Sequence, residues 1–132
     1  MKFMLMMNMP RGTGDYQINK WHPEAFKAHI QFMQDLNRDL VKTGEWVDGQ
    51  GLTPPGQAQI VRCGPGGVAV VSDGPFAETK EFLAGYWIVS VEKPERAYEI
   101  AAKASSAPGP DGKPLVIPIE VRRVMDGLPD EG

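Results

Sequence analysis

The sequence predicts an α+β domain in which an antiparallel sheet carries two helices on one of its faces. Two segments repeat apolar residues at helical spacing, and several short β-branched or aromatic runs are bounded by glycine or proline, as strands usually are. Along the chain these segments follow the order strand, helix, strand hairpin, strand, helix, strand, which this layered arrangement satisfies. A chain of 132 residues with 42% hydrophobic content fits one domain, residues 1–132, around a single modest core.

The first strand and the first helix are predicted at residues 3–8 and Pro23–Thr43. Proline suits the first helical position, Glu24 is favourable at the positive end of the helix, and Gly44 is a natural stop. The helix carries an apolar stripe, which we interpret as part of the core: Phe26, Ile30, Met33, Leu36 and Leu40.

The middle of the chain contains a predicted hairpin with strands at residues 58–63 and 68–72, joined by a turn rich in glycine. This turn lacks the Lys-Ser/Thr ending of a phosphate-binding loop, and no predicted helix follows it. A short strand is expected at residues 45–47, before the hairpin. Cys63 lies on a hairpin strand and is expected to be a core residue.

After the hairpin we expect one helical turn at residues 78–84, with Phe82 and Leu83 facing inward. Residues 86–91 then alternate as a strand. Three of its side chains are expected on one face: Trp87, Val89 and Val91.

The end of the chain supplies the second helix and the last strand. The helix opens at Pro94, a Pro/Gly-rich connector at residues 105–114 is expected to be mobile, and residues 115–125 alternate as a strand. This completes a ferredoxin-like sandwich whose uncovered sheet face should be buried by a second copy, sheet to sheet. The helix has a small-residue inner face for close packing on the sheet: Ala97, Ile100, Ala101 and Ala104.

Charge and composition exclude several functions. A formal net charge of -3 gives no electrostatic footprint for nucleic acid or an anionic membrane. No apolar run approaches the length that spans a bilayer, and Asn8 and Pro10 end the methionine-rich start, which favours a first strand over a signal segment. One cysteine excludes an internal disulfide framework and is compatible with the cytoplasm, where we expect the protein. The histidines, the cysteine and the acids show no metal-ligand spacing, and no cofactor is expected.

One polar stretch between two strands carries carboxylates, a cation, a hydroxyl and an apolar ring, where a plain connector would carry small turn residues. Gly74 can take positive φ and Pro75 fixes its own φ, so Asp73 would be held on a rigid turn. The stretch and its continuation are Asp73-Gly74-Pro75-Phe76-Ala77-Glu78-Thr79-Lys80-Glu81 and Gly85-Tyr86-Trp87.

This stretch resembles the hallmark of the DGPF branch of the YCII-related family, and residues 51–55 and 119–122 also resemble that family. The resemblance implies a ferredoxin-like domain that pairs into dimers, in a dimeric α/β-barrel-type assembly. It implies little about activity, because most members of the family have no assigned one.

The resemblance also implies a catalytic pair. In YCII-related proteins a histidine on the first helix and an aspartate are thought to form a catalytic-looking pair, and His29 and Asp73 match these residue types. A carboxylate beside an imidazole can orient a general base. Alternatively, His29 is a boundary histidine that satisfies its nitrogens locally, and Asp73 caps its own turn. The expected substrate-binding residues are Phe76, Lys80, Trp87 and His22, the last also a candidate for helix entry.

Two functions remain open from the sequence. The first is a small cofactor-free enzyme that performs proton transfer, elimination or isomerisation on a small molecule, since some YCII-like proteins are tied to aromatic breakdown. The second is a small-molecule-binding or regulatory module, since DGPF proteins often resemble partners of extracytoplasmic-function sigma factors. In both cases a homodimer is expected. A deep pocket enclosing Asp73 and His29 would favour the enzyme, and a shallow, solvated motif would favour the module.

Overall fold

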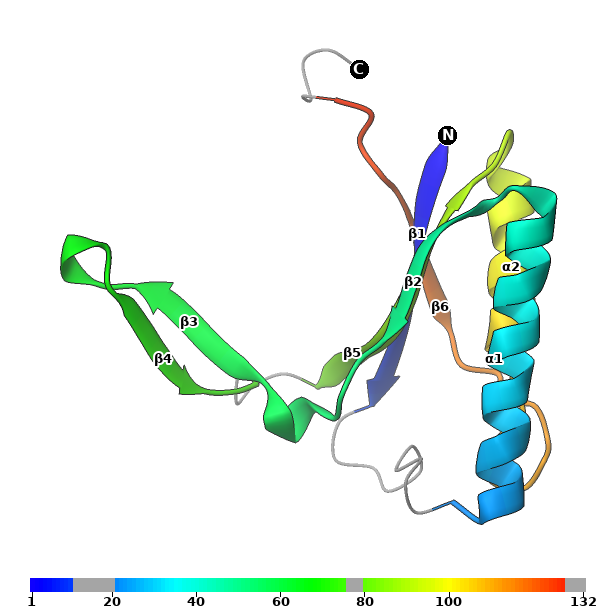
Figure 1. The fold of residues 1–132 in the computed structure, drawn as a ribbon, viewed down its shortest axis with the longest axis horizontal. Coiled ribbons are helices and arrows are strands. Elements are labelled where there is room, and N and C mark those ends of the chain that lie inside the picture. The colour runs from blue at the N-terminus through cyan, green and yellow to red at the C-terminus, as the bar shows by residue number, and fades with distance from the viewer. Residues whose placement is uncertain (11–20, 76–79, 128–132) are drawn as a thin grey trace.

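The computed structural model describes residues 1–10, 21–75 and 80–127 and confirms the α+β class. Two helices, α1 (Pro23–Thr43) and α2 (Pro94–Ser105), cover the same face of a four-stranded antiparallel sheet (Figure 1). The spatial order β2-β5-β1-β6 is compatible with the predicted ferredoxin-like fold. The strands are β1 (Lys2–Pro10), β2 (Trp46–Gly51), β5 (Glu81–Ser90) and β6 (Ile119–Arg123).

Helix α1 begins and ends where the sequence predicts. His22 is its N-cap, and its Nδ1 accepts a hydrogen bond of 3.3 Å from the backbone N–H of Glu24. Gly44 has φ +78°, the left-handed conformation that glycine adopts most readily, and its N–H donates to two carbonyls of the last turn, those of Leu40 and Val41.

Neither helix of the described part of the chain is both long and apolar enough to cross a membrane.

The core lies between the helices and one face of the sheet. Strands β1 and β5 alternate buried and half-buried residues, so one side of each strand contributes to the core. The predicted shared face of Trp87, Val89 and Val91 is confirmed, and all three are buried. The small-residue inner face of α2 is confirmed as well. The buried residues of β1 are Phe3, Leu5, Met7 and Met9.

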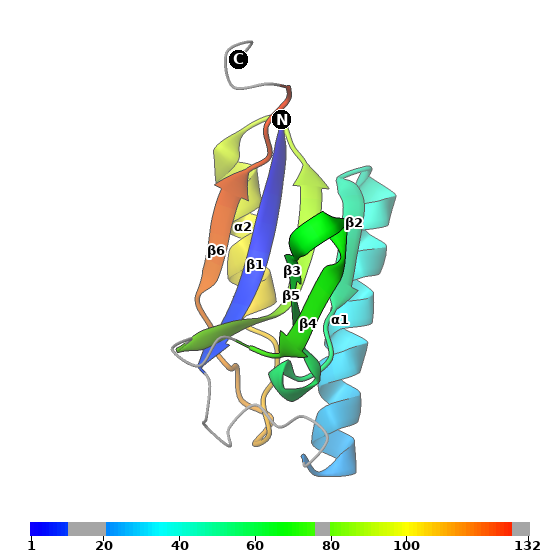
Figure 2. The ribbon, with the colours of Figure 1, turned by 90° about the vertical axis from the view of Figure 1, so that its left-hand side faces the viewer.

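The predicted hairpin forms, but it lies outside the main sheet. Its strands β3 (Gln59–Cys63) and β4 (Ala69–Asp73), with the short helices η3 (Pro55–Gln57) and η4 (Pro65–Gly67), leave the sheet on the side opposite the helices (Figures 1 and 2). Strand β2 occupies the edge next to β5, although the sequence predicted only a short strand at residues 45–47. The polar and glycine-rich composition of β2 is untypical of a strand, and its pairing with β5 stabilises the extended conformation. Cys63 is exposed, so its expected core position is wrong.

Three further expectations are corrected. The helical turn expected at residues 78–84 is a strand from Glu81 onward, because β5 continues its pairing with β1 as far as Pro10; residues 78 and 79 lie outside the described part. The connector at residues 105–114 was expected to be mobile, yet backbone hydrogen bonds fold it back on itself, including Leu115 N–H to the Ala107 carbonyl at 2.9 Å. The last strand is shorter than predicted, spanning Ile119–Arg123.

Gly74 does not have the positive φ that the sequence suggested. A Cβ at this position would lie 3.1 Å from Cγ1 of Ile60 and 3.3 Å from the carbonyl oxygen of Ala58. The Gly74 N–H also donates to that carbonyl at 2.9 Å. Glycine is therefore favoured by the close approach of two backbone segments at the base of the hairpin.

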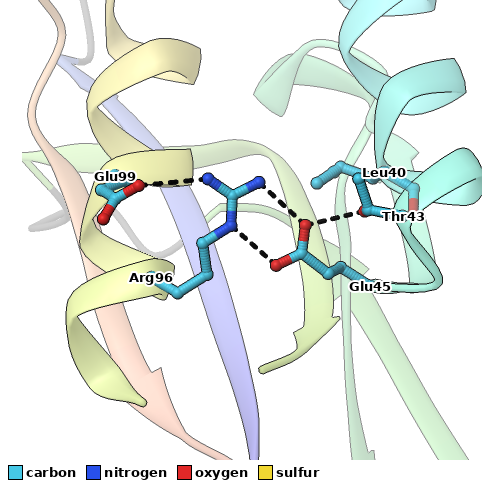
Figure 3. A network of polar contacts seen from close by, with 5 residues as sticks. All are labelled: Leu40, Thr43, Glu45, Arg96 and Glu99. Atoms are coloured by element: carbon cyan, nitrogen blue, oxygen red, sulfur yellow. Dashed lines mark hydrogen bonds and ion pairs between the residues drawn. The ribbon is translucent and has the colours of Figure 1, made fainter. Parts of the chain in front are cut away.

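One polar network joins the end of α1 to the start of α2 (Figure 3). The guanidinium of Arg96 donates two hydrogen bonds to the Glu45 carboxylate, at 2.7 and 2.8 Å, and contacts Glu99 at 3.2 Å. The Thr43 hydroxyl lies 2.7 Å from Oε1 of Glu45 and 3.1 Å from the Leu40 carbonyl. Hydrogen bonds from Arg96 hold the pKa of the Glu45 carboxyl below its ordinary value. This paired geometry connects the two helix ends through side chains from distant parts of the sequence.

We expect Arg96→Met to lower the free energy of unfolding by about 1 kcal/mol, because it removes a two-bond contact to a largely covered carboxylate. The value stays small because the Arg96 side chain is 43% exposed and water screens the pair. Urea unfolding of the natural protein and of Arg96→Met measures the difference in the free energy of unfolding. Arg38→Met is the matched control, because Arg38 makes a single exposed contact of 3.2 Å to Asp35. Equal losses in both variants would contradict this account.

Candidate functional site

A cavity of about 340 Å³ lies between α1 and the part of the sheet formed by β2 and β5. Its wall is mostly apolar, with a few polar side chains and the backbone of two neighbouring strands. Pockets with this composition are typical of small-molecule sites. The lining residues from α1 are Phe26, His29, Ile30, Met33 and Asn37; those from the sheet and its margins are Met7, Gly49, Gln50, Gly51, Leu52, Ala84, Gly85, Tyr86 and Trp87.

The apolar stripe of α1 explains where the cavity begins. Leu36 and Leu40, in the second half of the helix, are buried in the core as predicted. In the first half, Phe26 is exposed and Ile30 is half-buried, and both line the cavity together with Met33. The interpretation of the stripe as core is therefore wrong for Phe26 and Ile30, which form the cavity wall, whereas Met33 lines the cavity and also packs against the core.

The sheet contributes an irregular floor to the cavity. The pairing of β5 with β1 shifts by one residue between Met7 and Asn8, which places a bulge beside Ala84. A Cβ at Gly85 would lie 3.0 Å from the carbonyl oxygen of Gln50, so glycine permits the close approach of β5 to β2. The resulting wall is main chain from two strands.

His29 is the buried polar side chain of this cavity, with 2% of its surface exposed. Its Nδ1 lies 3.0 Å from the carbonyl oxygen of Pro108, in the connector after α2. The ring of Trp21 packs edge-on against the imidazole, with ring centroids 5.3 Å apart and planes at 82°. Contacts from the residue before the α1 cap and from the connector after α2 therefore fix the orientation of the ring.

The Pro108 contact also assigns the tautomer of His29. A carbonyl oxygen only accepts, so Nδ1 carries the proton, and in the neutral ring the lone pair is on Nε2. Burial lowers the pKa of His29, and the hydrogen bond to the Pro108 carbonyl opposes this change only in part. At neutral pH the ring is therefore uncharged and has the protonation state of a general base.

Two further side chains are oriented by hydrogen bonds. The indole N–H of Trp87 donates to Oδ1 of Asn37 at 2.8 Å, so Asn37 presents its amide N–H groups as the remaining donors. Tyr86 alternates with Trp87 along β5 and donates its hydroxyl proton to Asp48 at 2.9 Å, on the face away from the helices. This hydrogen bond, with desolvation and the negative charge of Asp48, raises the pKa of Tyr86.

The structure separates the site residues predicted from the sequence. His29 and Trp87 both line the cavity. His22 is the exposed cap of α1, and Lys80 is exposed just before β5; neither lines the cavity. Phe76 lies outside the described residues.

Asp73 is exposed at the end of β4, in the hairpin, and does not line the cavity. Strand β4 and helix α1 lie on opposite sides of the sheet (Figure 1). Within the described part of one chain, the contacts do not bring Asp73 and His29 together. Their pairing stays a prediction.

Sequence reasoning missed Trp21, Asn37 and the β2 segment with Leu52 as parts of the site. The helical pattern held a usable signal, because His29, Met33 and Asn37 follow each other at intervals of four residues and so share one face of α1. The contribution of β2 had no such signal, since it depends on pairing with β5 across more than thirty residues of chain. Trp21 precedes the helix, and its contact depends on how the chain enters α1.

The geometry defines an α+β domain with a small, mostly apolar cavity around a buried neutral histidine. Family comparison agrees with this class: a family model of the YCII-related domain matches residues 1–108, and the chain belongs to that family. It is also similar to an uncharacterized protein of Rhizobium meliloti (strain 1021), with 29% identity over 99 residues that span 75% of this chain and 79% of the relative. Membership of the DGPF branch stays a prediction from the sequence motif.

No metal centre accompanies the cavity in the part of the chain that the structure describes. Within residues 1–10, 21–75 and 80–127, no three His, Cys, Asp or Glu side chains are close enough together to hold an ion. The chemistry available at the cavity wall is that of the imidazole of His29, the amide of Asn37 and the backbone of β2 and β5.

The lowered pKa of His29 predicts how stability depends on pH. The unfolded chain binds a proton at this residue near pH 6.5, whereas the folded chain binds it only at lower pH, so the unfolded state holds more protons in between. Stability should therefore fall as the pH is lowered from about 6.5. Urea unfolding at pH 7.5 and 5.5 measures the loss, which should be smaller in His29→Gln. Glu45 contributes only at lower pH, because its pKa is lowered from 4.5. An equal loss in both proteins would contradict the assignment.

Proposed function

We propose that the cavity binds a small, mostly apolar molecule and that His29 accepts a proton from it, as in a cofactor-free enzyme of proton transfer or isomerisation. The observation that carries this proposal is a buried, neutral imidazole in the wall of an otherwise apolar cavity. A histidine buried only for packing would not need an adjoining hollow of about 340 Å³.

The size and lining of the cavity suggest the class of ligand. Its volume is at the lower end of the range of about 300–1,000 Å³ found for ligand sites, which suits a molecule of about one substituted ring. The side chains of Phe26, Ile30 and Met33 offer apolar contact, while the amide of Asn37 offers a hydrogen-bond donor. A ring with one carbonyl or carboxylate group has the complementary chemistry.

The proposed step is a balanced proton transfer. The lone pair of Nε2 takes a proton from an acidic C–H or O–H of the ligand, which leaves the electron pair on the ligand and converts His29 to an imidazolium. The Pro108 carbonyl, which accepts from Nδ1, stabilises this cation. Return of the proton to another atom of the ligand completes an isomerisation and restores the neutral ring.

His29→Asn tests the proposal, because asparagine retains a donor near the position of Nδ1 but has no counterpart of Nε2. We expect it to weaken binding of ligands found by a thermal-shift metabolite screen by about tenfold, as loss of a buried hydrogen-bonding group does, and to abolish any turnover. His22→Asn is the control, because His22 is exposed and does not line the cavity. Equal affinity of all three proteins would refute the assigned role of His29.

A second candidate function is a binding or regulatory module without turnover, of the kind that the resemblance to DGPF proteins associates with sigma-factor signalling. The exposure of Asp73 and Lys80, outside the cavity, favours this candidate. Turnover distinguishes the two, because a module leaves a bound ligand chemically unchanged. Where turnover is found, Asp73→Asn tests the dyad: the variant should lose turnover as His29→Asn does if Asp73 pairs with His29, and should keep it if Asp73 has no catalytic role.

We further propose that the functional unit is a homodimer in which two sheets pack face to face, as in a dimeric α/β-barrel-type assembly. Both helices cover one side of the sheet, so its other side, named here the open face, has no helix on it (Figure 1). Half-buried apolar side chains from the two central strands form its centre. They are Met4, Met6, Tyr86 and Ile88.

Ile88→Lys should convert the dimer to a monomer, because it places a charge at the centre of an apolar interface, where it would have to be desolvated. Light scattering should give twice the chain mass for the natural sequence and the single chain mass for this variant. Val41→Lys, on an exposed position of α1, is the control and should remain dimeric. A monomeric natural protein at tens of micromolar would contradict the proposal.

A further inference from the structure

The hairpin projects from the body of the protein as an arm, which we define as Gln59–Cys63, the turn with η4, and Ala69–Asp73. Among the elements of the described chain, β3 and β4 have extensive contacts only with each other. The arm leaves the sheet on the side of the open face, and seen from that side it stands in front of the sheet (Figures 1 and 2). A two-stranded hairpin without a packing partner is marginally stable in water.

The two sides of the arm differ in chemistry. The pairing of β3 with β4 places Val61 opposite Val71 and Cys63 opposite Ala69, and residues opposite each other share a face. These four residues form a continuous apolar surface, the valine face, on which Val61 is 60% and Val71 is 58% exposed. At the base of the arm the same side ends in a polar pair, Gln59 opposite Asp73. The other side is mixed, because Arg62 lies opposite Val70 there, and Ile60 lies opposite Ser72.

The arm and the open face therefore present two apolar surfaces on one side of one molecule. On the open face, Met4 pairs with Ile88 and Met6 with Tyr86, and the neighbouring positions on β6 are Arg122 and Glu120. An apolar centre with charged margins is the usual pattern of a protein interface.

We propose that the valine face of the arm lies on a second copy of this chain, so that each copy of the dimer clasps the other. The inference rests on the homodimer of the proposed function and adds the arm to its interface. Two-fold symmetry makes such a contact reciprocal: when the arm of one copy lies on the second, the arm of the second lies on the first, and the valine faces of both are covered. An unrelated partner would have to be complementary to the arm and to the open face at the same time, without this symmetry.

The available area agrees with a stable dimer. Strand spacing and rise give four strands of five residues a projected face of about 300 Å², and the two strands of the arm about 150 Å². Side-chain relief makes the accessible area larger, which brings the sum toward the roughly 800 Å² per partner of a standard interface. The sheet face alone offers about two thirds of this surface, so the arm is a substantial part of it.

Neighbouring valines give a matched test. Val71 and Val70 are 58% and 52% exposed and lie on opposite sides of the same strand. We expect Val71→Ser to raise the dimer dissociation constant at least tenfold, because two buried valines are lost per dimer, and Val70→Ser to change it less than about twofold. Analytical ultracentrifugation over a concentration series measures both, and circular dichroism checks that each variant is folded.

Cys63 provides an independent readout, because it is the one cysteine of the sequence and lies on the valine face. Its rate of reaction with a thiol reagent should fall as protein concentration rises through the dimer transition, and it should be fast in Val71→Ser. A dimeric natural protein with a fast thiol and no effect of Val71→Ser would overturn the arm contact but leave the sheet-to-sheet dimer. A monomeric natural protein would overturn both. A loss of dimer in Val70→Ser alone would overturn the choice of the valine face.

Discussion

The structure depends on one constraint: two helices cover only one face of a four-stranded sheet. Strand β1 and the second half of β5 therefore alternate: the side chains on one side of each strand are buried against α1 and α2, and those on the other side are only half-buried. The core is correspondingly thin, a single layer between helices and sheet. Further apolar side chains lie on the open face and on the arm, and both of these are on the side of the sheet away from the helices.

The cavity follows from how α1 meets this sheet. The helix is fastened near its C-terminal end, where Leu36 and Leu40 are buried and where Glu45 and Arg96 connect it to α2. Toward its N-terminal end its apolar side chains are less buried, and the space between helix and strands remains hollow. His29 lies in this half, where its ring contacts the ring of Trp21 and its Nδ1 donates to the Pro108 carbonyl. The C-terminal half of α1 can be closely packed while its N-terminal half borders a cavity, because the two halves contact different parts of the chain.

Local pattern predicted the elements well and their assembly less well. The ends of α1 were correct because a proline, an acid and a glycine act within one turn of the helix. The core faces of β5 and α2 were correct because burial on one side imposes a period that the sequence displays. Strand β2 was underestimated because Asp48, Gly49 and Gly51 favour turns locally, while pairing with β5 decides their conformation. The hairpin was predicted to belong to the main sheet for the same reason. Its residues show that β3 and β4 are strands but not that they pair only with each other.

In the candidate site too, features that depend on neighbouring residues were predictable, and contacts between residues far apart in the chain were not. His29 was singled out because of its position on the helix, and Trp87 because it follows the motif; both line the cavity. The Pro108 contact was not predictable, because it joins residues 79 positions apart in the chain through a connector that looked mobile. The protonation state of His29 depends on that contact and on burial, so the chemistry of the site needed the tertiary structure.

The most specific stretch of the sequence lies where the arm returns to the sheet. Between the end of β4 at Asp73 and the start of β5 at Glu81, the chain must change from the direction of the arm to that of the sheet. Gly74 supports this change, because its N–H donates to the Ala58 carbonyl and a Cβ there would crowd Ile60 and that carbonyl, at 3.1 and 3.3 Å. The contact between Gly74 and Ala58 therefore fixes the base of the arm. If the arm clasps a second copy, the position of this base determines where the valine face meets its partner, so Gly74 contributes to assembly even where Asp73 takes no part in chemistry.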